Sequence, residues 1–199
     1  MFSFTQYERV DYPLEKNDSL LNLAWAGGLN SPQFSKIDLN FDGEEDLFVF
    51  ERGWDATIKT FIWNNGQYEY APQYESAFPL MRNWSILADY NCDGKADIFT
   101  WSEFGGGISI YRNTSENGVL SFEREETLLF TETVNGPLNV FVNGSDIPAV
   151  VDVDFDGDLD ILAFSIGGIH VEMQKNMSME RYGVCDSLEF ILEDACWGK

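Results

Sequence analysis

The residues best suited to chemistry in this chain are carboxylates, which recur in three short loops of one pattern. Each loop reads Asp-x-(Asp/Asn)-x-Asp-Gly-x-x-Asp. Carboxylates this close together repel one another unless a cation lies among them, and oxygen ligands at alternate positions with a glycine at position 6 are how proteins wrap calcium. The sequence therefore predicts one Ca²⁺ ion in each loop, about three in all. The residues at positions 1, 3, 5 and 9 are Asp38, Asn40, Asp42 and Asp46, then Asp89, Asn91, Asp93 and Asp97, then Asp152, Asp154, Asp156 and Asp160.

The way each loop closes separates it from an EF-hand. An EF-hand closes with a glutamate at position 12 and leads into a helix, as a dockerin does, whereas position 12 here is Val49, Thr100 or Ala163. An aspartate stands at position 9 instead, and the β-branched and aromatic residues after it favour a strand. The loops are also too far apart for the tandem repeats of a calcium β-helix. We therefore expect each metal site in a turn between two strands.

The three loops differ in charge. Position 3 is asparagine in the first two loops, whereas the third has Asp154 there, with Asp158 nearby. More ligand charge raises affinity for a hard cation, so we expect the third site to bind calcium most tightly. In saturating calcium, Asp156→Ala should then cost more thermal stability than Asp93→Ala.

The loops begin about 50 to 60 residues apart, which is close to the size of one four-stranded propeller blade. Strands are expected on both sides of each loop, and turn signals follow at Asn64-Asn65-Gly66, Gly105-Gly106-Gly107 and Gly167-Gly168. The expected strands are 34–37, 46–50, 58–63 and an outer strand within 68–78, then 86–88, 98–101 and 108–112, then 149–151, 161–164 and 169–173. The predicted division is a lead-in over 1–30, then blade repeats over 31–80, 81–140 and 141–199, the last incomplete and with a Cys-bearing tail.

This order of loop, strand, glycine turn and strand resembles the FG-GAP/VCBS repeats of integrin-α-type calcium-binding β-propellers, over about residues 31–175. The string Trp25-Ala26-Gly27-Gly28-Leu29-Asn30 is similar to the amino-terminal part of large secreted or surface proteins of Bacteroidota-type bacteria. The resemblance implies an all-β fold with four-stranded antiparallel blades, about three of a larger, seven-bladed propeller. It also implies that the carboxylates at positions 1, 3, 5 and 9 hold Ca²⁺. The backbone carbonyl at position 7 would complete the site, and that residue is Glu44, Lys95 or Asp158 here.

Composition restricts the possible partners. The chain has 12 Lys and Arg against 34 Asp and Glu, a net charge of −22, and 44% hydrophobic residues. This acidity argues against binding nucleic acid or an anionic membrane surface, since both need basic patches. No apolar run approaches the length of a membrane helix, so no membrane insertion is expected.

Three blades do not close a propeller, so we expect a piece of a longer chain whose remaining blades are partners. The first four residues lack the features of a secretory signal, so an export signal would lie upstream. In an arc of three blades, apolar residues such as Phe48, Phe50, Leu162 and Phe164 are expected on bare outer faces. The isolated chain should then be poorly stable or self-associate, most visibly in calcium.

The chain has three cysteines. Cys185 and Cys196 could close a small hairpin through a disulfide or stay unbridged, and the sequence favours neither outcome. Cys92 occupies position 4 of the second loop, where its side chain should point away from the metal. A free structural thiol is the predicted state of Cys92.

Two functions from different classes are compatible with these features. The first, which we favour, is a non-catalytic, secreted or cell-surface propeller module for adhesion, binding an extracellular protein or a glycan. The alternative is a fragment of a propeller-based polysaccharide hydrolase or lyase. The one histidine, His170, is expected to face solvent from a strand, so no catalytic residue is predicted. Trp54, Trp84 and Trp101 could serve a ligand surface, although packing between blades is the favoured interpretation.

Overall fold

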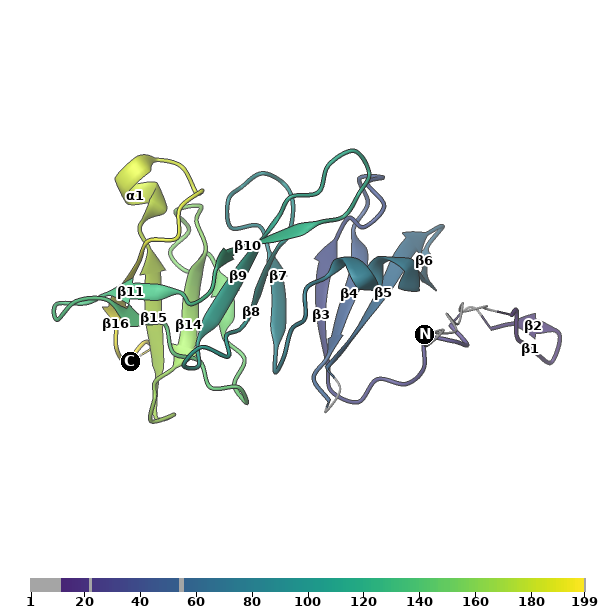
Figure 1. The fold of residues 1–199 in the computed structure, drawn as a ribbon, viewed down its shortest axis with the longest axis horizontal. Helices are drawn as coiled ribbons and strands as arrows, with labels where there is room; N and C mark the ends of the chain where they lie inside the picture. The colour runs from purple at the N-terminus through teal and green to yellow at the C-terminus, as the bar shows by residue number, and fades with distance from the viewer. Residues whose placement is uncertain (1–11, 22, 54–55, 199) are drawn as a thin grey trace, which may run out of the picture.

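The computed structural model describes residues 12–21, 23–53 and 56–198. Its ordered elements are almost all strands, and three main sheets stand side by side along the long axis of the molecule (Figure 1). Each main sheet contains four consecutive antiparallel strands, with one additional pair of strands on the third sheet. The expected all-β architecture of propeller-like blades is thereby confirmed.

The first sheet has the strand order β3-β4-β5-β6, and the first acidic loop joins β3 to β4. Asn65 and Gly66 have φ of 49° and 86° and make the tight turn from β5 to β6. The expected outer strand is present as β6, and after it Pro72 begins a 3-10 helix, η1. The bounds are β3 (Pro32–Ile37), β4 (Asp46–Glu51), β5 (Thr57–Asn64), β6 (Gln67–Tyr70) and η1 (Pro72–Ala77).

The second sheet repeats this plan, with the order β10-β9-β8-β7 and the second acidic loop between β7 and β8. Gly105 and Gly106 have φ of 88° and 71° in the turn that leads from β8 to β9. The expected strands are therefore present, and an outer strand is added. The bounds are β7 (Ser85–Ala88), β8 (Asp97–Trp101), β9 (Ile108–Asn113) and β10 (Phe122–Glu126).

The third sheet is larger than predicted, with the order β12-β11-β16-β15-β14-β13. The Cys-bearing tail supplies a short helix, α1, and a fourth antiparallel strand, β16. β11 and β12 lie before residue 140 but extend this sheet, because β11 pairs with β16 in parallel. The bounds are β11 (Phe130–Glu132), β12 (Leu138–Asn139), β13 (Ala149–Val151), β14 (Asp160–Phe164), β15 (Val171–Asn176), α1 (Ser178–Tyr182) and β16 (Phe190–Asp194).

The hydrophobic core lies between neighbouring sheets. Phe48 and Phe50 of the first sheet pack with Ile98 and Tyr111 of the second. The expectation that Phe48 and Phe50 are exposed is wrong: both are 0% exposed. Alternation along β4 explains the error, because residues 48 and 50 share the face that meets the second sheet. Phe164 of the third sheet is 46% exposed, as expected.

Two tryptophans serve packing between the second and third sheets. Trp84 is 0% exposed and belongs to the cluster that also contains Phe99 and Ile161, while Trp101 is half-buried against that cluster. The packing interpretation is therefore confirmed for Trp84. Trp54 lies outside the described residues.

The lead-in carries only a small hairpin, β1 (Glu15–Lys16) with β2 (Ser19–Leu20), at the end of the molecule beyond the first sheet (Figure 1). Ala26 packs with Val49 and Phe61, so the lead-in contributes to the core on that side of the first sheet. Among the described residues, no helix has the length and apolar character needed to cross a membrane.

Candidate metal centres

The first aspartate of each loop holds the loop in its curled shape. The carboxylate of Asp38 accepts the backbone N–H groups of Asp42 (3.2 Å) and Gly43 (2.9 Å). Asp89 accepts the equivalent pair in the second loop, and Asp152 accepts the N–H groups of Phe155 and Gly157 in the third. Charged acceptors make these bonds strong. Hydrogen bonds from the backbone of each loop to its own first aspartate therefore hold the loop in shape.

Two residues in each loop adopt left-handed backbone conformations. Position 4 is Phe41, Cys92 or Phe155, with φ between 56° and 64°. The glycine at position 6 has φ between 83° and 106°, a conformation that costs other residues energy. The turn therefore requires the glycine of the pattern, and the position-4 side chain stands at the tip of the loop.

Positions 3 and 5 are linked differently in the three loops. Asn40 donates from Nδ2 to Asp42 Oδ2 (2.8 Å), and Asn91 donates in the same way to Asp93 (3.4 Å). The third loop has Asp154 at position 3, and there the Lys175 ammonium group forms an ion pair with Asp154. The asparagines thus reduce repulsion inside the first two loops, and a lysine from β15 does so in the third.

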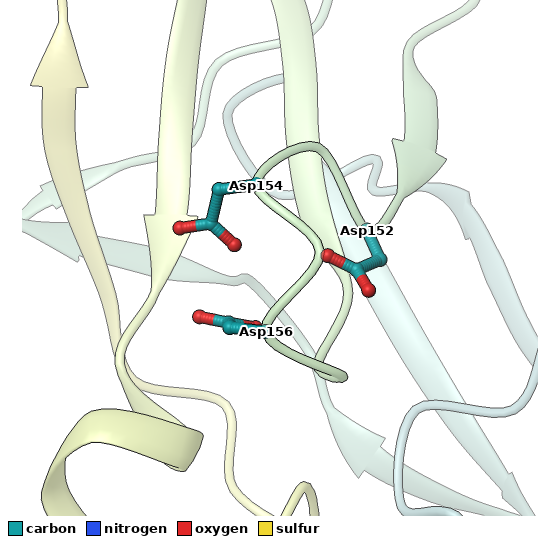
Figure 2. A group of neighbouring side chains, drawn as sticks. All are labelled: Asp152, Asp154 and Asp156. Carbon is teal, nitrogen blue, oxygen red and sulfur yellow. The ribbon is translucent and has the colours of Figure 1, made fainter.

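The third loop brings three predicted ligands together. One carboxylate oxygen from each of Asp152, Asp154 and Asp156 lies within 4.8 Å of the other two, and their side chains face a common space (Figure 2). Oδ2 of Asp156 is buried and has no hydrogen-bond partner among the described residues. Its charged neighbour is the Lys175 ammonium group, 3.5 Å away. An all-oxygen donor set suits a hard cation such as Ca²⁺, so these residues fit the expected metal.

The aspartate at position 9 has a structural role that the sequence did not reveal. Asp46, Asp97 and Asp160 are each 0% exposed. In every loop this carboxylate accepts the backbone N–H of position 2 and an N–H from the third strand of the blade, at 2.7 to 3.0 Å. Each oxygen keeps a further lone pair, and the place of position 9 in the calcium shell stays a prediction.

Burial acts on the ionisation of these position-9 groups. It raises the pKa of Asp97 to about 6 and raises the pKa of Asp46 and Asp160 as well, while the two backbone N–H donors of each group oppose the shift. The hydrogen bonds thus favour the charged form that burial disfavours. These three aspartates fasten the loops to the sheets.

The position-7 side chains point to different surroundings. Glu44 is exposed, and the Lys95 ammonium donates to the carbonyl of Ser115 (3.1 Å). The Asp158 carboxylate is buried and accepts the backbone N–H of Met179 (2.9 Å). The expected ligand at position 7 is the backbone carbonyl, and that role stays a prediction for all three residues.

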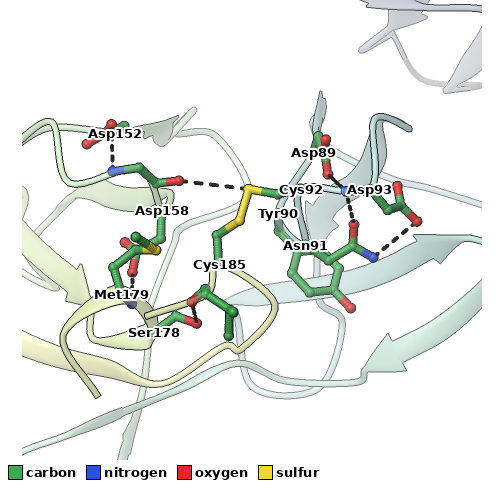
Figure 3. The surroundings of a disulfide bond; sticks show 12 residues. Asp89, Tyr90, Asn91, Cys92, Asp93, Asp152, Asp158, Ser178, Met179 and Cys185 are labelled. Carbon is green, nitrogen blue, oxygen red and sulfur yellow. Dashed lines mark hydrogen bonds between the residues drawn. A yellow bond between two sulfur atoms is a disulfide. The ribbon is translucent and has the colours of Figure 1, made fainter. Parts of the chain in front are cut away.

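A disulfide joins the second loop to the third blade (Figure 3). Cys92 pairs with Cys185, with 6.0 Å between their Cα atoms and a sequence separation of 93. Cys196 is free. The predicted free state of Cys92 is therefore wrong. The question left open for Cys185 and Cys196 is also answered, since they are not bridged to each other. Packing of neighbouring blades sets Cys92 against the segment after α1, a proximity that spacing along the sequence does not show.

Two further charged residues near the third loop escaped the sequence pattern. Lys175 lies on β15, and Glu180 lies on α1; their side chains form an ion pair with each other. Neither belongs to a repeated motif, so the sequence carries no signal for them, and only the tertiary structure places them beside the third loop. His170 lies in the turn before β15 rather than in a strand and is half-buried.

A comparison with known protein families finds one family whose model covers all three loops. A family model described as FG-GAP-like repeat matches residues 38–100 and 89–163. Each matched segment begins at the first aspartate of one loop and ends in the strand after the next loop. Together the two segments span more than half of the chain. No curated protein and no solved structure matches this sequence.

Proposed function

The chain belongs to the FG-GAP-like repeat family, and we propose that it is a calcium-binding, non-catalytic extracellular module of an integrin-α-type β-propeller. The observation that carries the proposal is the convergence of Asp152, Asp154 and Asp156 within 4.8 Å. The first and second loops support it, because their position-1 aspartates and glycines repeat the same backbone arrangement. Loops with this arrangement and this charge are suited to hold Ca²⁺ between the first and second strands of each blade.

Bound calcium would supply the positive charge that lets the carboxylates of each loop lie close together. The protein residues would do the rest: position 1 orders the loop backbone, and position 9 ties the loop to the third strand. The proposed role of the metal is therefore structural. Because calcium would bind the folded loop and not the unfolded chain, it would raise the free energy of unfolding of the blade.

An extracellular location is supported by the Cys92–Cys185 disulfide. Disulfides persist in oxidising compartments and are rare in the cytosol. Extracellular calcium-binding modules also work with weak sites, roughly 0.1 to 1 mM, which suits loops that contain asparagine at position 3.

A protein or glycan partner is proposed for the edge opposite the calcium loops. The turns that follow β8 and β14 lie at that edge, because each of these strands begins at a calcium loop. Exposed apolar side chains occur there: Phe104 is 55% exposed, Ile166 80% and Ile169 84%. Side chains of this kind on turns are suited to contact a ligand.

Thermal melting with and without calcium tests the structural role. The chelated protein should melt at a lower temperature than the protein in millimolar calcium, and magnesium at the same concentration should restore less stability because it demands stricter geometry. Equal melting temperatures in calcium and in chelator would contradict the proposal. The partner surface is tested separately, by retention on immobilised polysaccharides and extracellular-matrix proteins, with Phe104→Ser and Ile166→Ser expected to reduce retention without changing the melting temperature.

A further inference from the structure

Three carboxylates converge beside the third loop in an arrangement that the loop pattern does not include. Carboxylate oxygens of Asp156, Asp158 and Glu180 lie within 4.8 Å of one another. Asp158 is the position-7 residue, whose family role is played by the backbone, and Glu180 comes from α1, outside the loop. Only Asp156 is shared with the set formed by the pattern aspartates.

The Asp158 side chain is the strongest observation in favour of a ligand site here. It is 1% exposed. Its Oδ2 accepts the backbone N–H of Met179, which fixes the carboxylate (Figure 3). Its Oδ1 is buried and has no hydrogen-bond or ion-pair partner among the described residues. Leaving a carboxylate oxygen buried and unpaired is costly, so a positively charged partner is expected.

Lys175 does not satisfy this need. Its ammonium group forms ion pairs with Asp154, with Glu180 and, at 3.5 Å, with Oδ2 of Asp156. These contacts place the lysine between the two carboxylate sets, while Oδ1 of Asp158 stays unpaired.

The total negative charge around the third loop and Glu180 is better balanced by two divalent cations than by one. Six carboxylates surround the region, and one calcium ion together with Lys175 would neutralise only half of them. Two divalent cations with Lys175 would neutralise all but one. The six are Asp152, Asp154, Asp156, Asp158, Asp160 and Glu180.

We propose that the third blade holds a second divalent cation, bound by Asp156, Asp158 and Glu180, beside the ion of the third loop. The all-carboxylate donor set selects a hard cation, and Ca²⁺ is the occupant we assign. Asp156 would bridge the two ions. The presence of the neighbouring ion rests on the proposed function. The second site itself does not, because Asp158 and Glu180 are not carboxylates of the loop pattern.

Counting bound ions tests this site. The chain of 199 residues, freed of metal with a chelator, is titrated with calcium and examined by native mass spectrometry, with circular dichroism as a check on folding. The unmodified chain should bind one ion more than the three loops account for, and Glu180→Gln should bind one fewer than the unmodified chain. Glu193→Gln is the matched control, because Glu193 is an exposed acid on β16 of the same sheet. An unchanged ion count in Glu180→Gln would overturn the proposal.

Two further variants separate this site from the loop sites. Asp158→Asn keeps an oxygen that can accept the Met179 N–H, and it should lose the same ion as Glu180→Gln. Asp152→Asn removes a ligand of the third loop that the second site does not use, so the ion that depends on Glu180 should remain. If only the ion that depends on Glu180 binds, the loop proposal fails and this one stands. If only loop ions bind, or if none bind because Asp158 is protonated instead, this proposal is wrong.

Discussion

Oδ1 of Asp97 accepts the backbone N–H of Asn113 at 2.7 Å, a contact that fastens the start of β8 to the end of β9. Oδ2 of the same carboxylate accepts the N–H of Tyr90 at 3.0 Å, inside the second loop. One buried side chain thus connects a loop and two strands. Because this connection consists of hydrogen bonds to the backbone, it stabilises the blade whether or not a cation is bound.

Asp97→Ala should destabilise the protein even in chelator. The substitution leaves two buried N–H groups without their charged acceptor, which costs about 2 to 4 kcal/mol. Asp93→Ala changes an exposed position-5 residue and should reduce stability chiefly in calcium. Denaturant unfolding of both variants, each in calcium and in chelator, measures the difference. An Asp97→Ala effect confined to calcium would show that Asp97 acts only as a ligand.

Lys175→Met should change stability in opposite directions in the two conditions. Without calcium, Asp154 and Glu180 lose the ammonium group that pairs with them, so the melting temperature should fall. With calcium, the substitution removes the Lys175 ammonium group that competes with the metal for Asp154. The calcium affinity of the third loop should then rise about tenfold, which equals about 1.4 kcal/mol.

Calorimetric titration and thermal melting measure these two effects of Lys175→Met. Lys36→Met is the control, since Lys36 pairs with the exposed Glu45 at the surface of the first blade, where an ion pair contributes little. Weaker calcium binding in Lys175→Met would contradict a competing role for the lysine.

Loss of the disulfide should weaken the contact between the second and third blades. The bridge closes a segment with a sequence separation of 93 residues, and removal of such a link costs about 2 to 4 kcal/mol. We expect this loss in the Cys92→Ser, Cys185→Ser double variant, measured by denaturant unfolding, while Cys196→Ser should behave as the unmodified chain. Peptide mapping without reductant should recover Cys92 linked to Cys185; a Cys185–Cys196 peptide would contradict the structure.

Two phenylalanine substitutions, one between neighbouring sheets and one on an exposed face of the third sheet, test the packing of the blades. Phe50 is 0% exposed between the first and second sheets, whereas Phe164 is 46% exposed. Phe50→Ala should therefore cost about 3 to 5 kcal/mol, and Phe164→Ala about 1 kcal/mol or less. Equal losses in unfolding free energy would mean that the first two sheets do not pack as described.

The local pattern of this chain is readable from its sequence because loop, strand and turn each depend on neighbouring residues. Gly43 and Gly94 mark the turns, and the apolar, β-branched and aromatic run from Leu47 to Phe50 marks a strand. The contacts between distant residues are different. Neither the Cys92–Cys185 pairing nor the approach of Glu180 to Asp158 leaves a local signal, because packing between separate segments brings these residues together.

Two features of the structure depend on contacts between separate segments. The aspartate at position 9 is predicted to be a metal ligand from its spacing, and the structure adds a second role, because its oxygens accept backbone N–H groups in all three blades. Phe48 and Phe50 were expected on an open face because β4 alone does not say which of its two faces meets a neighbour. Both questions require the tertiary structure.

The most direct test of calcium binding in all three loops is an ion count on variants of each loop. Asp38→Ala, Asp89→Ala and Asp152→Ala each remove the position-1 ligand of one loop, and Glu193→Gln serves as the control. Native mass spectrometry at millimolar free calcium should show that each loop variant binds one ion fewer than the unmodified chain, whereas the control binds the same number. A chain that binds no calcium, or loop variants that keep the full count, would contradict the account.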